Sequence, residues 1–412
     1  MTFQRPKSTP KSLKTGRNNM AYALKILKEV DVKGKKVLLR VAYDITLEKQ
    51  AGEWIVPDDL RINATIPTIQ YLLSQGCSLG LLSWLKRPAG KVNLDLSLGP
   101  VAKRLGELLG KNVEMLSDCV GKEISKRILA LKPGEIVMLE NVRFHPEEEK
   151  NDPEFARSLT EGFDFIVYDA FAQAHRIHSS TTGILENLPA SSGFLFEKEI
   201  SFLSRLLEDV KHPFVVVLGG AKISDKIETM QNLLEKADSM LIGGALANTF
   251  LLAEGHEVGK SLVEDIYVNI AKGEKQDYVA LAKEVLDKGR EKVKLPVDFF
   301  AASSPDSAAS KVVNIDQGEE ISEDQGFYDI GPRTIELFEE ILKSAKTVFM
   351  NGPMGFFERE PFALGTKRIS EAIIQSGATS IIGGGDTEGI VSRYGWVGKF
   401  THVSTGGGAT LE

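Results

Sequence analysis

Apolar segments of strand length recur along the chain, and each is followed by a turn and a segment with helical periodicity. The strand-like segments are KVLLRV (36–41), SLGLLS (78–83), EIVMLE (135–140), FIVYDA (165–170), FVVVLG (214–219), SMLIGG (239–244), TVFMNG (347–352) and SIIGGG (380–385). Amphipathic patterns such as IPTIQYLLSQG and GPRTIELFEEILKSA lie between them. Because apolar strands alternating with amphipathic helices are typical of parallel sheets covered on both faces, the pattern predicts an α/β fold.

The pattern divides into two halves. The stretch NLPASSGFLFEKEISFLSRLLEDV lies between them, and Pro189 and Gly193 mark the break. Apolar residues then recur at helical spacing, at Phe196, Ile200, Leu203, Leu207 and Val210. We therefore expect two doubly wound, Rossmann-like parallel-sheet lobes joined by a hinge helix, the first over residues 21–192 and the second over residues 193–400.

Residues 1–20 differ in composition from the rest of the chain. They contain no acidic residue, are rich in Ser and Thr, and carry the basic residues Arg5, Lys7, Lys11, Lys14 and Arg17. This composition indicates a disordered basic tail. An organelle transit peptide is the alternative interpretation.

Composition narrows the functional class. The 412 residues are 42% hydrophobic and 26% charged, and the net charge of -7 argues against a general nucleic-acid binder. Only Cys77 and Cys119 are cysteines, and their spacing matches no metal or redox motif, so we expect buried thiols in the reducing cytoplasm. No apolar run approaches the ~20 residues of a membrane span.

The two halves differ in the residues that follow their strands. In the first half, the strands and nearby turns lead to the cations Arg40, Arg61, Arg87, Arg143 and Arg176. In the second half, they lead to the glycines Gly219, Gly220, Gly243, Gly244, Gly352 and Gly383 to Gly385. Since ligands of open α/β sheets bind beyond the carboxyl ends of the strands, the first half is predicted to hold an anion with side chains. The second half is predicted to bring its backbone close to a ligand.

The turn GGAKISDK places two lysines after a buried strand. It lacks the spacing of the common nucleotide-binding loop, in which Gly-Lys-Ser/Thr follows the first glycine after four residues. Lys222 and Lys226 are four residues apart, so on a helix they would share a face and repel each other. An anion between them would remove that repulsion. The alternative is that both lysines simply face solvent.

Two further residues lie where a helix is expected to begin. Asp386 in GGGDTEGIVSRYG could cap the helix or bind a magnesium ion that accompanies a phosphate. Arg61 in PDDLRINATIP stands in a first helical turn, where a cation opposes the helix dipole. It either folds back onto Asp58 or Asp59, or faces the same anion as the helix N-terminus.

No arrangement of residues indicates a catalytic triad or an isolated general base. His175 and His178 would share one helix face, but Arg176 lies between them and disfavours a metal ion. Transfer of a phosphoryl group to an ionised acceptor needs no base. The obstacle is then repulsion between anions, which cations and helix N-termini reduce.

Taken together, these segments resemble the phosphoglycerate kinase family. The resemblance rests on PDDLRI, LENVRFHPEEEKNDPEFA, DAFAQAHRIHSS, GGAKISDKIETMQNLL, GPRTIELF, MNGPMGFFEREPFALGT, SIIGGGDT and HVSTGGGATLE, which occur in the family's order. It implies two lobes that close around the substrates, with residues 401–412 returning toward the first lobe. The implied reaction is reversible phosphoryl transfer between 1,3-bisphosphoglycerate with MgADP and 3-phosphoglycerate with MgATP, in glycolysis.

The resemblance also implies roles for individual residues. Arg61 and Lys222 would steady the transferring phosphoryl group, Lys226 would contact nucleotide phosphates, and Asp386 would organise Mg²⁺. The other residues of the nucleotide site would be Gly243, Gly244, Asn351, Pro353, Glu358, Gly384, Gly385 and Thr387. The triose phosphate would be held by Arg61, Arg87, Arg143 and Arg176.

The chain departs from the family mainly where the acceptor would bind. The family's R-V-D-F-N reads here Arg40-Val41-Ala42-Tyr43-Asp44, and its S-H-L-G-R-P reads Ser83-Trp84-Leu85-Lys86-Arg87-Pro88. In the adenine region, G-G-G-M is replaced by Gly243-Gly244-Ala245-Leu246, and the chain ends at Glu412, before the short tail usual in the family.

These departures allow three interpretations. In the first, which we favour, Asp44 supplies the carboxylate missing at Ala42, and Lys86 supplies the cation lost at Trp84. In the second, the enzyme phosphorylates a different phosphorylated carboxylic acid. In the third, the protein binds nucleotide without catalysis. We expect a monomeric cytoplasmic kinase that binds neither nucleic acid nor membranes.

Overall fold

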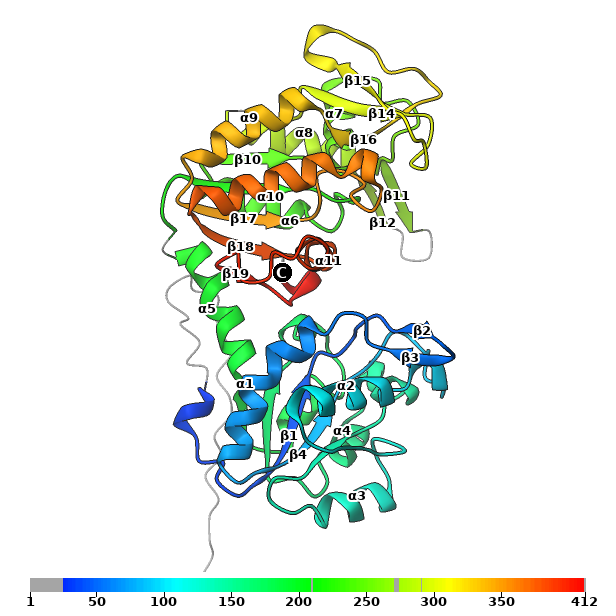
Figure 1. Ribbon diagram of the computed structural model, residues 1–412, viewed down its shortest axis with the longest axis vertical. Coiled ribbons are helices and arrows are strands. Elements are labelled where there is room, and N and C mark those ends of the chain that lie inside the picture. The colour runs from blue at the N-terminus through cyan, green and yellow to red at the C-terminus, as the bar shows by residue number, and fades with distance from the viewer. Residues whose placement is uncertain (1–24, 209, 270–273, 290, 411–412) are drawn as a thin grey trace, which may run out of the picture.

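Two parallel β-sheets, one in each half of the chain, organise the computed structural model (Figure 1). The structure describes residues 25–208, 210–269, 274–289 and 291–410. The predicted basic tail, residues 1–20, lies outside this part of the chain. No helix among the described residues is long and apolar enough to cross a membrane.

The first lobe is a six-stranded parallel sheet in the order β5-β6-β4-β1-β7-β8. Its strands are β1 (Lys36–Val41), β4 (Ser78–Leu82), β5 (Val113–Met115), β6 (Ile136–Met138), β7 (Phe165–Asp169) and β8 (Ala190–Ser192), and an antiparallel pair, β2 (Glu48–Gln50) and β3 (Glu53–Ile55), lies beside it. Its helices are α1 (Leu60–Ser74), α2 (Gly99–Leu109), α3 (Lys122–Leu129) and α4 (Pro153–Leu159).

Strand β1 shows why this sheet is apolar throughout. Leu39 belongs to one hydrophobic core of the lobe, and its neighbour Leu38 belongs to another. Since successive side chains of a strand point to opposite faces, both faces of the sheet are covered. Each fully buried side chain of this size contributes about 1.5–3 kcal/mol to the free energy of folding.

The second lobe repeats this architecture, with strand order β13-β10-β9-β17-β18-β19. Its main strands are β9 (Phe214–Leu218), β10 (Ser239–Ile242), β13 (Val293–Lys294), β17 (Thr347–Asn351), β18 (Thr379–Gly383) and β19 (His402–Val403). Smaller sheets pair β11 (Ile266–Asn269) with β12 (Glu274–Asp277), and β14 (Asp298–Ala302) with β15 (Lys311–Asn314) and β16 (Gly326–Ile330). The helices are α6 (Ile227–Leu234), α7 (Leu246–Glu254), α8 (Tyr278–Gly289), α9 (Pro332–Lys343), α10 (Leu364–Ser376) and α11 (Gly385–Arg393).

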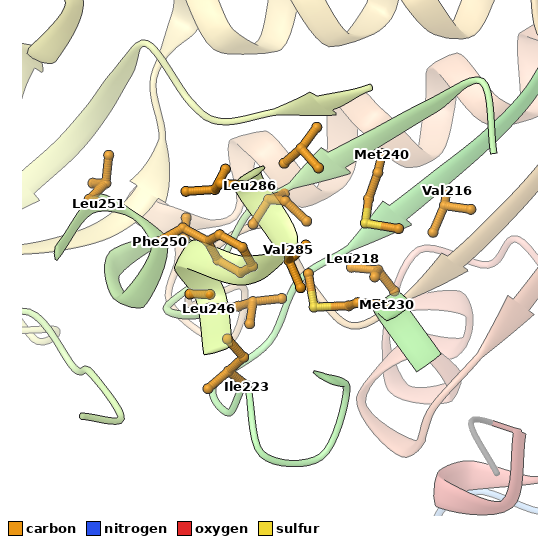
Figure 2. Packing of buried hydrophobic residues seen from close by; sticks show 14 of the residues in the cluster. Val216, Leu218, Ile223, Met230, Met240, Leu246, Phe250, Leu251, Val285 and Leu286 are labelled. Atoms are coloured by element: carbon orange, nitrogen blue, oxygen red, sulfur yellow. The ribbon is translucent and has the colours of Figure 1, made fainter. Parts of the chain in front are cut away.

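One core of the second lobe lies between the sheet and its helices. Figure 2 shows Val216 and Leu218 of β9 and Met240 of β10 packed with Met230 of α6 and Phe250 of α7. The alternate residues of β9, Val215 and Val217, join a separate core on the opposite face. The predicted α/β fold with two doubly wound lobes is therefore confirmed.

The order of strands determines where each lobe can bind a ligand. In the second sheet the chain passes from β9 to β10 on one side, whereas β17 pairs with β9 on the other side. In the first sheet, β4 and β7 flank β1 in the same way. The loops that leave the carboxyl ends of such neighbouring strands diverge, and the crevice between them is the usual ligand site.

Helix α5 (Phe194–Glu208) is the predicted hinge helix and packs on both lobes (Figure 1). Its first residue, Phe194, donates its backbone N–H to Thr68 of α1 at 3.0 Å, and its ring packs against Tyr71. Toward its other end, Leu206 joins a core of the second lobe. The helix thus connects the two lobes mechanically.

The C-terminal segment is tied to this helix by a buried carboxylate. Glu199 of α5 and His402 of β19 are both fully buried, and their side chains are hydrogen-bonded at 2.8 Å. The backbone N–H and hydroxyl of Thr405 donate to the same carboxylate at 2.8 and 3.0 Å. The following residues return to the first lobe, since a Cβ atom on Gly406 would lie 2.6 Å from the Phe171 ring.

The carboxyl group of Asp169 at the end of β7 is expected to make stability depend on pH. It accepts the Phe196 N–H of α5 at 2.9 Å, yet burial raises its pKa from an ordinary value near 3.8 to about 6. The folded state therefore binds this proton more tightly than the unfolded state does. The free energy of unfolding should fall as pH rises from about 4 to about 6, by up to about 3 kcal/mol.

Urea unfolding of the wild type and of Asp169→Asn, measured between pH 4 and pH 7, checks this prediction. The uncharged variant lacks the titrating group, so its stability relative to the wild type should increase across this range. Parallel pH profiles for the two proteins would contradict the prediction.

Candidate functional site

Two cavities lie at the carboxyl ends of the second lobe's strands. The first, here called the interlobe cavity, has a volume of about 550 Å³ and is lined by His175, Arg176, Ser224, Asp225, Lys226, Glu228, Thr229, Asn351, Gly352, Gly384, Gly385, Asp386 and Gly407. The second, here called the apolar cavity, has a volume of about 330 Å³ and is lined by Gly220, Ala221, Gly244, Ala245, Leu262, Pro305, Tyr328, Pro353, Gly355, Phe356, Glu358 and Asp386. Asp386 borders both cavities.

Close backbone contacts explain the glycines after β9 and β10. A Cβ atom on Gly219 would lie 2.0 Å from the carbonyl oxygen of Pro353. Gly244 has φ +62°, and a Cβ atom there would lie 2.6 Å from the backbone nitrogen of Gly220. Side chains at these positions would separate the three turns that frame the apolar cavity. The glycines therefore allow the turns to pack closely, and the approach of this backbone to a ligand stays a prediction.

The turn that carries the two lysines is not helical. Helix α6 begins at Ile227, so Lys222 and Lys226 do not share a helix face, and that expectation was wrong. Lys226 is 9% exposed and lines the interlobe cavity. Burial lowers its pKa, while the neighbouring carboxylates of Asp225, Asp386 and Glu264 act in the opposite direction.

Lys222 occupies a different environment from Lys226. Its side chain is exposed, and it lies between Ala221, which lines the apolar cavity, and Ser224, which lines the interlobe cavity. The turn thus borders both cavities and carries one exposed cation and one buried cation. Long exposed lysine side chains sample many rotamers and can reach an anion in either space.

Glu264 supports this turn and was not predicted from the sequence. Its carboxylate accepts the Ser224 backbone N–H and the Ser224 hydroxyl, each at 2.9 Å. These two bonds from a distant segment add to the turn's own hydrogen bond, from the Lys226 N–H to the Ile223 carbonyl at 2.9 Å. Nothing in the sequence around Glu264 distinguishes it from other surface acids.

Helix α11 presents its N-terminus to the interlobe cavity. Gly384 is its N-cap residue, with φ +101°, and no side chain caps the helix. Asp386 therefore does not act as the cap, which was one of its two interpretations, and its exposed carboxylate is available to a cation. The next residue, Thr387, is buried. Its hydroxyl donates to the Gly383 carbonyl at 2.7 Å and accepts the Gly352 N–H at 3.2 Å.

The other residues predicted for the nucleotide site divide between the cavities. Asn351, Gly384 and Gly385 line the interlobe cavity. Gly244, Pro353 and Glu358 line the apolar cavity. Gly243 borders neither, because its backbone packs against Met354. The structure thus places a polar, cation-bearing space directly beside an apolar one.

The first lobe contributes His175 and Arg176 to the interlobe cavity. The segment from His175 to His178 is not helical, so the expected helix face with two histidines is absent. The described residues contain one group with metal-ligand geometry, Asp118 with Cys119 and His145, which does not include them. Burial and the nearby arginines lower the pKa of His178 to about 4, so this imidazole is neutral at pH 7.

Four residues predicted for the acceptor side form a connected chain of contacts. Arg61 Nη1 donates to the backbone carbonyl of Asp44 at 3.2 Å. The Asp44 carboxylate accepts the Lys86 N–H at 3.0 Å and lies 3.9 Å from the Lys86 ammonium. Arg143 Nη1 donates to the Lys86 carbonyl at 2.8 Å. Arg87 is exposed nearby and contributes positive charge that lowers the pKa of Arg143, in addition to the larger effect of burial.

Arg40, Trp84 and Glu148 form the buried floor beneath these residues. Arg40 Nε donates to Ser180, whose hydroxyl and N–H in turn donate to the fully buried Glu148 carboxylate at 2.6 and 2.9 Å. The Arg40 guanidinium also lies over the Trp84 ring. The sequence suggested Arg40 only as one of several cations, and it gave no indication of a role for Glu148.

The arrangement suits a large anion held between the lobes. Arg176 comes from one lobe and Lys226 from the other, and the N-terminus of α11 opens into the same cavity. A cation and a helix N-terminus both stabilise negative charge, and their effect increases when water is excluded. The apolar cavity beside it can receive an uncharged ring.

Comparisons with known proteins agree with this geometry. A family model described as "Phosphoglycerate kinase" matches residues 27–412. A phosphoglycerate kinase from Pelotomaculum thermopropionicum is 46% identical over 394 residues, which cover 95% of this chain and 96% of that relative. One from Moorella thermoacetica is 47% identical over 387 residues, covering 94% and 95%. The solved phosphoglycerate kinase from Pyrococcus horikoshii OT3 matches with a TM-score of 0.82 at 35% identity, covering 94% of this chain and 95% of that chain.

Proposed function

The chain belongs to the phosphoglycerate kinase family, and on this premise we propose that it performs the family's glycolytic reaction. It transfers a phosphoryl group reversibly between 1,3-bisphosphoglycerate with MgADP and 3-phosphoglycerate with MgATP. The observation that carries the proposal is the interlobe cavity, where Arg176 of one lobe and Lys226 of the other line the same space. The acceptor is a carboxylate and already ionised, so the reaction requires charge neutralisation rather than a base.

On the donor side, the two cavities match the two parts of a nucleotide. The apolar cavity would hold the base and ribose, with Gly244, Pro353 and Glu358 in its wall. The phosphates would extend into the interlobe cavity, toward Asn351, Lys226 and the N-terminus of α11 with Gly384 and Gly385. Thr387 would act indirectly, because its hydroxyl fixes the turn after β17 against α11.

Lys222 would neutralise the phosphoryl group during transfer. It lies on the turn between the two cavities and its ammonium is exposed, so it can follow the group as charge moves. Lys226, which is buried, would instead hold phosphates that stay with the nucleotide. An exposed and a buried lysine on one turn thus serve different steps.

The residues present also fit the Mg²⁺ ion that accompanies nucleotide phosphates. Asp386 is exposed, borders both cavities and is not used as a helix cap. Its carboxylate oxygens are the hard ligands that Mg²⁺ prefers, and the phosphates supply the others. When bound, the ion would neutralise part of the phosphate charge.

On the acceptor side, 3-phosphoglycerate would be held by Arg61, Arg87, Arg143 and Arg176, with Asp44 and Lys86 beside them. We propose that Asp44 and Lys86 compensate together for the family residues absent at positions 42 and 84. The support is that they contact each other directly, through the Lys86 N–H and through the ammonium. A carboxylate and a cation at this point can meet the substrate hydroxyl and phosphate.

Transfer would require the lobes to close. Arg61 belongs to α1 of the first lobe and Lys222 to the second, and both are assigned to the same phosphoryl group. Hinge closure excludes water and completes such a site. Since one chain supplies every residue assigned here, we propose a monomer, and we place it in the cytoplasm with the other enzymes of its pathway.

A coupled assay with 1,3-bisphosphoglycerate and MgADP tests the function itself. The expected result is formation of ATP that depends on both substrates and on Mg²⁺. Absence of ATP at millimolar substrate concentrations, from protein with a normal circular dichroism spectrum, would contradict the proposal. Nucleotide binding without turnover would then favour the non-catalytic interpretation.

Replacement of Lys222 by Ala separates transition-state from ground-state roles. Loss of a charged hydrogen bond made mainly during transfer should lower kcat by about 100-fold or more, with the Kd for MgATP changed less than about threefold. Turnover assays and calorimetry measure the two effects. Equal losses in kcat and nucleotide affinity would refute the role assigned to Lys222.

Replacement of Lys86 by Gly is expected to separate stability from binding. Lys86 has φ +55°, in the left-handed region, whereas its ion pair with Asp44 is partly exposed and 3.9 Å long. Relief of the backbone strain, which costs ~1–2 kcal/mol, should exceed the loss of such a pair, worth ~0–1 kcal/mol. Urea unfolding should therefore show a variant that is at least as stable as the wild type.

The same Lys86→Gly variant should bind 3-phosphoglycerate more weakly in calorimetry, because the compensating cation is gone. Unchanged binding would reject the compensation proposal. A marked loss of stability would show instead that the Asp44–Lys86 pair is mainly structural.

A further inference from the structure

Two buried arginines share the ring of Trp84. The guanidinium carbon of Arg143 lies 4.1 Å from the centre of the indole, and that of Arg40 lies 4.5 Å from it. Trp84 itself is 2% exposed and its ring also packs against His178, with ring centres 5.2 Å apart. An aromatic face attracts cations, and Trp does so most strongly among the side chains.

The arginines differ in their freedom to meet a ligand. Arg40 is completely buried and is fixed by Ser180, behind which the Glu148 carboxylate supplies the opposite charge. Arg143 is 6% exposed and has fewer constraints. Arg40 therefore belongs to the floor of the site, and Arg143 is the arginine of the pair that can reach the surface.

The three donor nitrogens of the Arg143 guanidinium differ in their partners. Nη1 is occupied by the Lys86 carbonyl at 2.8 Å, and Nε lies 3.5 Å from the Glu149 carboxylate. Nη2 makes no hydrogen bond to any residue that the structure describes. Nε also lacks a hydrogen-bond partner, but it is buried, so Nη2 is the donor left for an anion.

The loop that receives Arg143 is also held in place. Asp44 binds the N–H of Lys86 while Arg143 binds its carbonyl, so both polar groups of this residue are engaged. The left-handed backbone of Lys86 turns the loop so that both bonds can form. Asp44, Lys86, Arg143 and Trp84 thus constrain one another.

We propose that Trp84 is a positioning residue for acceptor recognition, which holds the Arg143 guanidinium so that its free Nη2 edge meets the phosphate of 3-phosphoglycerate. The proposal rests on the function proposed above and extends it to a residue that need not touch the substrate. An aromatic partner at this distance restricts the movement of the guanidinium, which reduces the entropy lost when an anion binds to it. Trp84 would thereby set affinity for the acceptor and leave the nucleotide site unaffected.

Steady-state kinetics of Trp84→Leu and Trp84→Phe test the proposal. Leu removes the aromatic face, so the KM for 3-phosphoglycerate should rise about 10-fold, with kcat and the KM for MgATP within about twofold of the wild type. Phe keeps a smaller aromatic face and should recover most of the affinity. The matched control is Trp54→Leu, since Trp54 also lies under a cation, Lys49, but in the exposed β2–β3 hairpin; its kinetic constants should not change.

A spectroscopic measurement keeps the proposal testable if the Leu variant folds poorly. In a Trp54→Phe/Trp396→Phe protein, Trp84 is the remaining tryptophan. Saturating 3-phosphoglycerate should change its emission, because the guanidinium over the ring engages the ligand, whereas MgADP alone should not.

The outcomes separate this proposal from the function on which it rests. A wild type without turnover contradicts the proposed function. An active wild type whose Trp84→Leu variant keeps its KM for the acceptor overturns the role of Trp84. An equal rise in the KM values for 3-phosphoglycerate and MgATP would likewise overturn it. So would a Trp84 emission that does not change when 3-phosphoglycerate is saturating.

Discussion

The buried carboxylate of Glu199 is the constraint on which the two-lobed arrangement depends. An ionised group removed from water is costly unless donors surround it, and Glu199 is surrounded by the His402 imidazole and by two groups of Thr405. These partners come from the end of the chain, whereas Glu199 belongs to the helix shared by both lobes. The carboxylate therefore fixes the C-terminal segment against α5, and the segment then reaches the first lobe at Phe171. A Cβ atom on Gly407 would lie 3.8 Å from Arg61 Nη2, so the same constraint brings this segment beside a proposed catalytic cation.

Charge in the site is arranged by depth. Buried cations have fixed partners, as Arg40 has Ser180 and an aromatic ring, while cations such as Lys222 and Arg87 are exposed. Burial lowers the pKa of Lys226, and three neighbouring carboxylates counteract this effect. Deep groups thus define the shape of the site, and under the proposed function shallow groups would adapt to a phosphate that changes position.

Regular patterns in the sequence were sufficient for the architecture. The apolar runs identified the central strands of both sheets, and the glycines after β9 and β10 fall in turns that line the candidate site. Local geometry was less accessible: GGAKISDK was expected to be helical through both lysines, but α6 begins at Ile227. Helical spacing does not reveal where a turn ends when a distant carboxylate, here Glu264, binds its backbone. The contact of Trp84 with two arginines could not be predicted from the sequence either, because only tertiary packing brings Arg40, Trp84 and Arg143 together.

The separation of the hydrophobic cores between the lobes has a consequence for how such a protein can diverge. Each sheet packs within its own lobe, and the lobes share little besides α5 and the C-terminal segment. Substitutions such as Asp44, Trp84 and Lys86 are confined to one lobe, where Asp44 contacts Lys86 and Arg143 contacts both Lys86 and Trp84. Natural selection can therefore remodel recognition of one reactant as a module, while the machinery for the other is inherited intact.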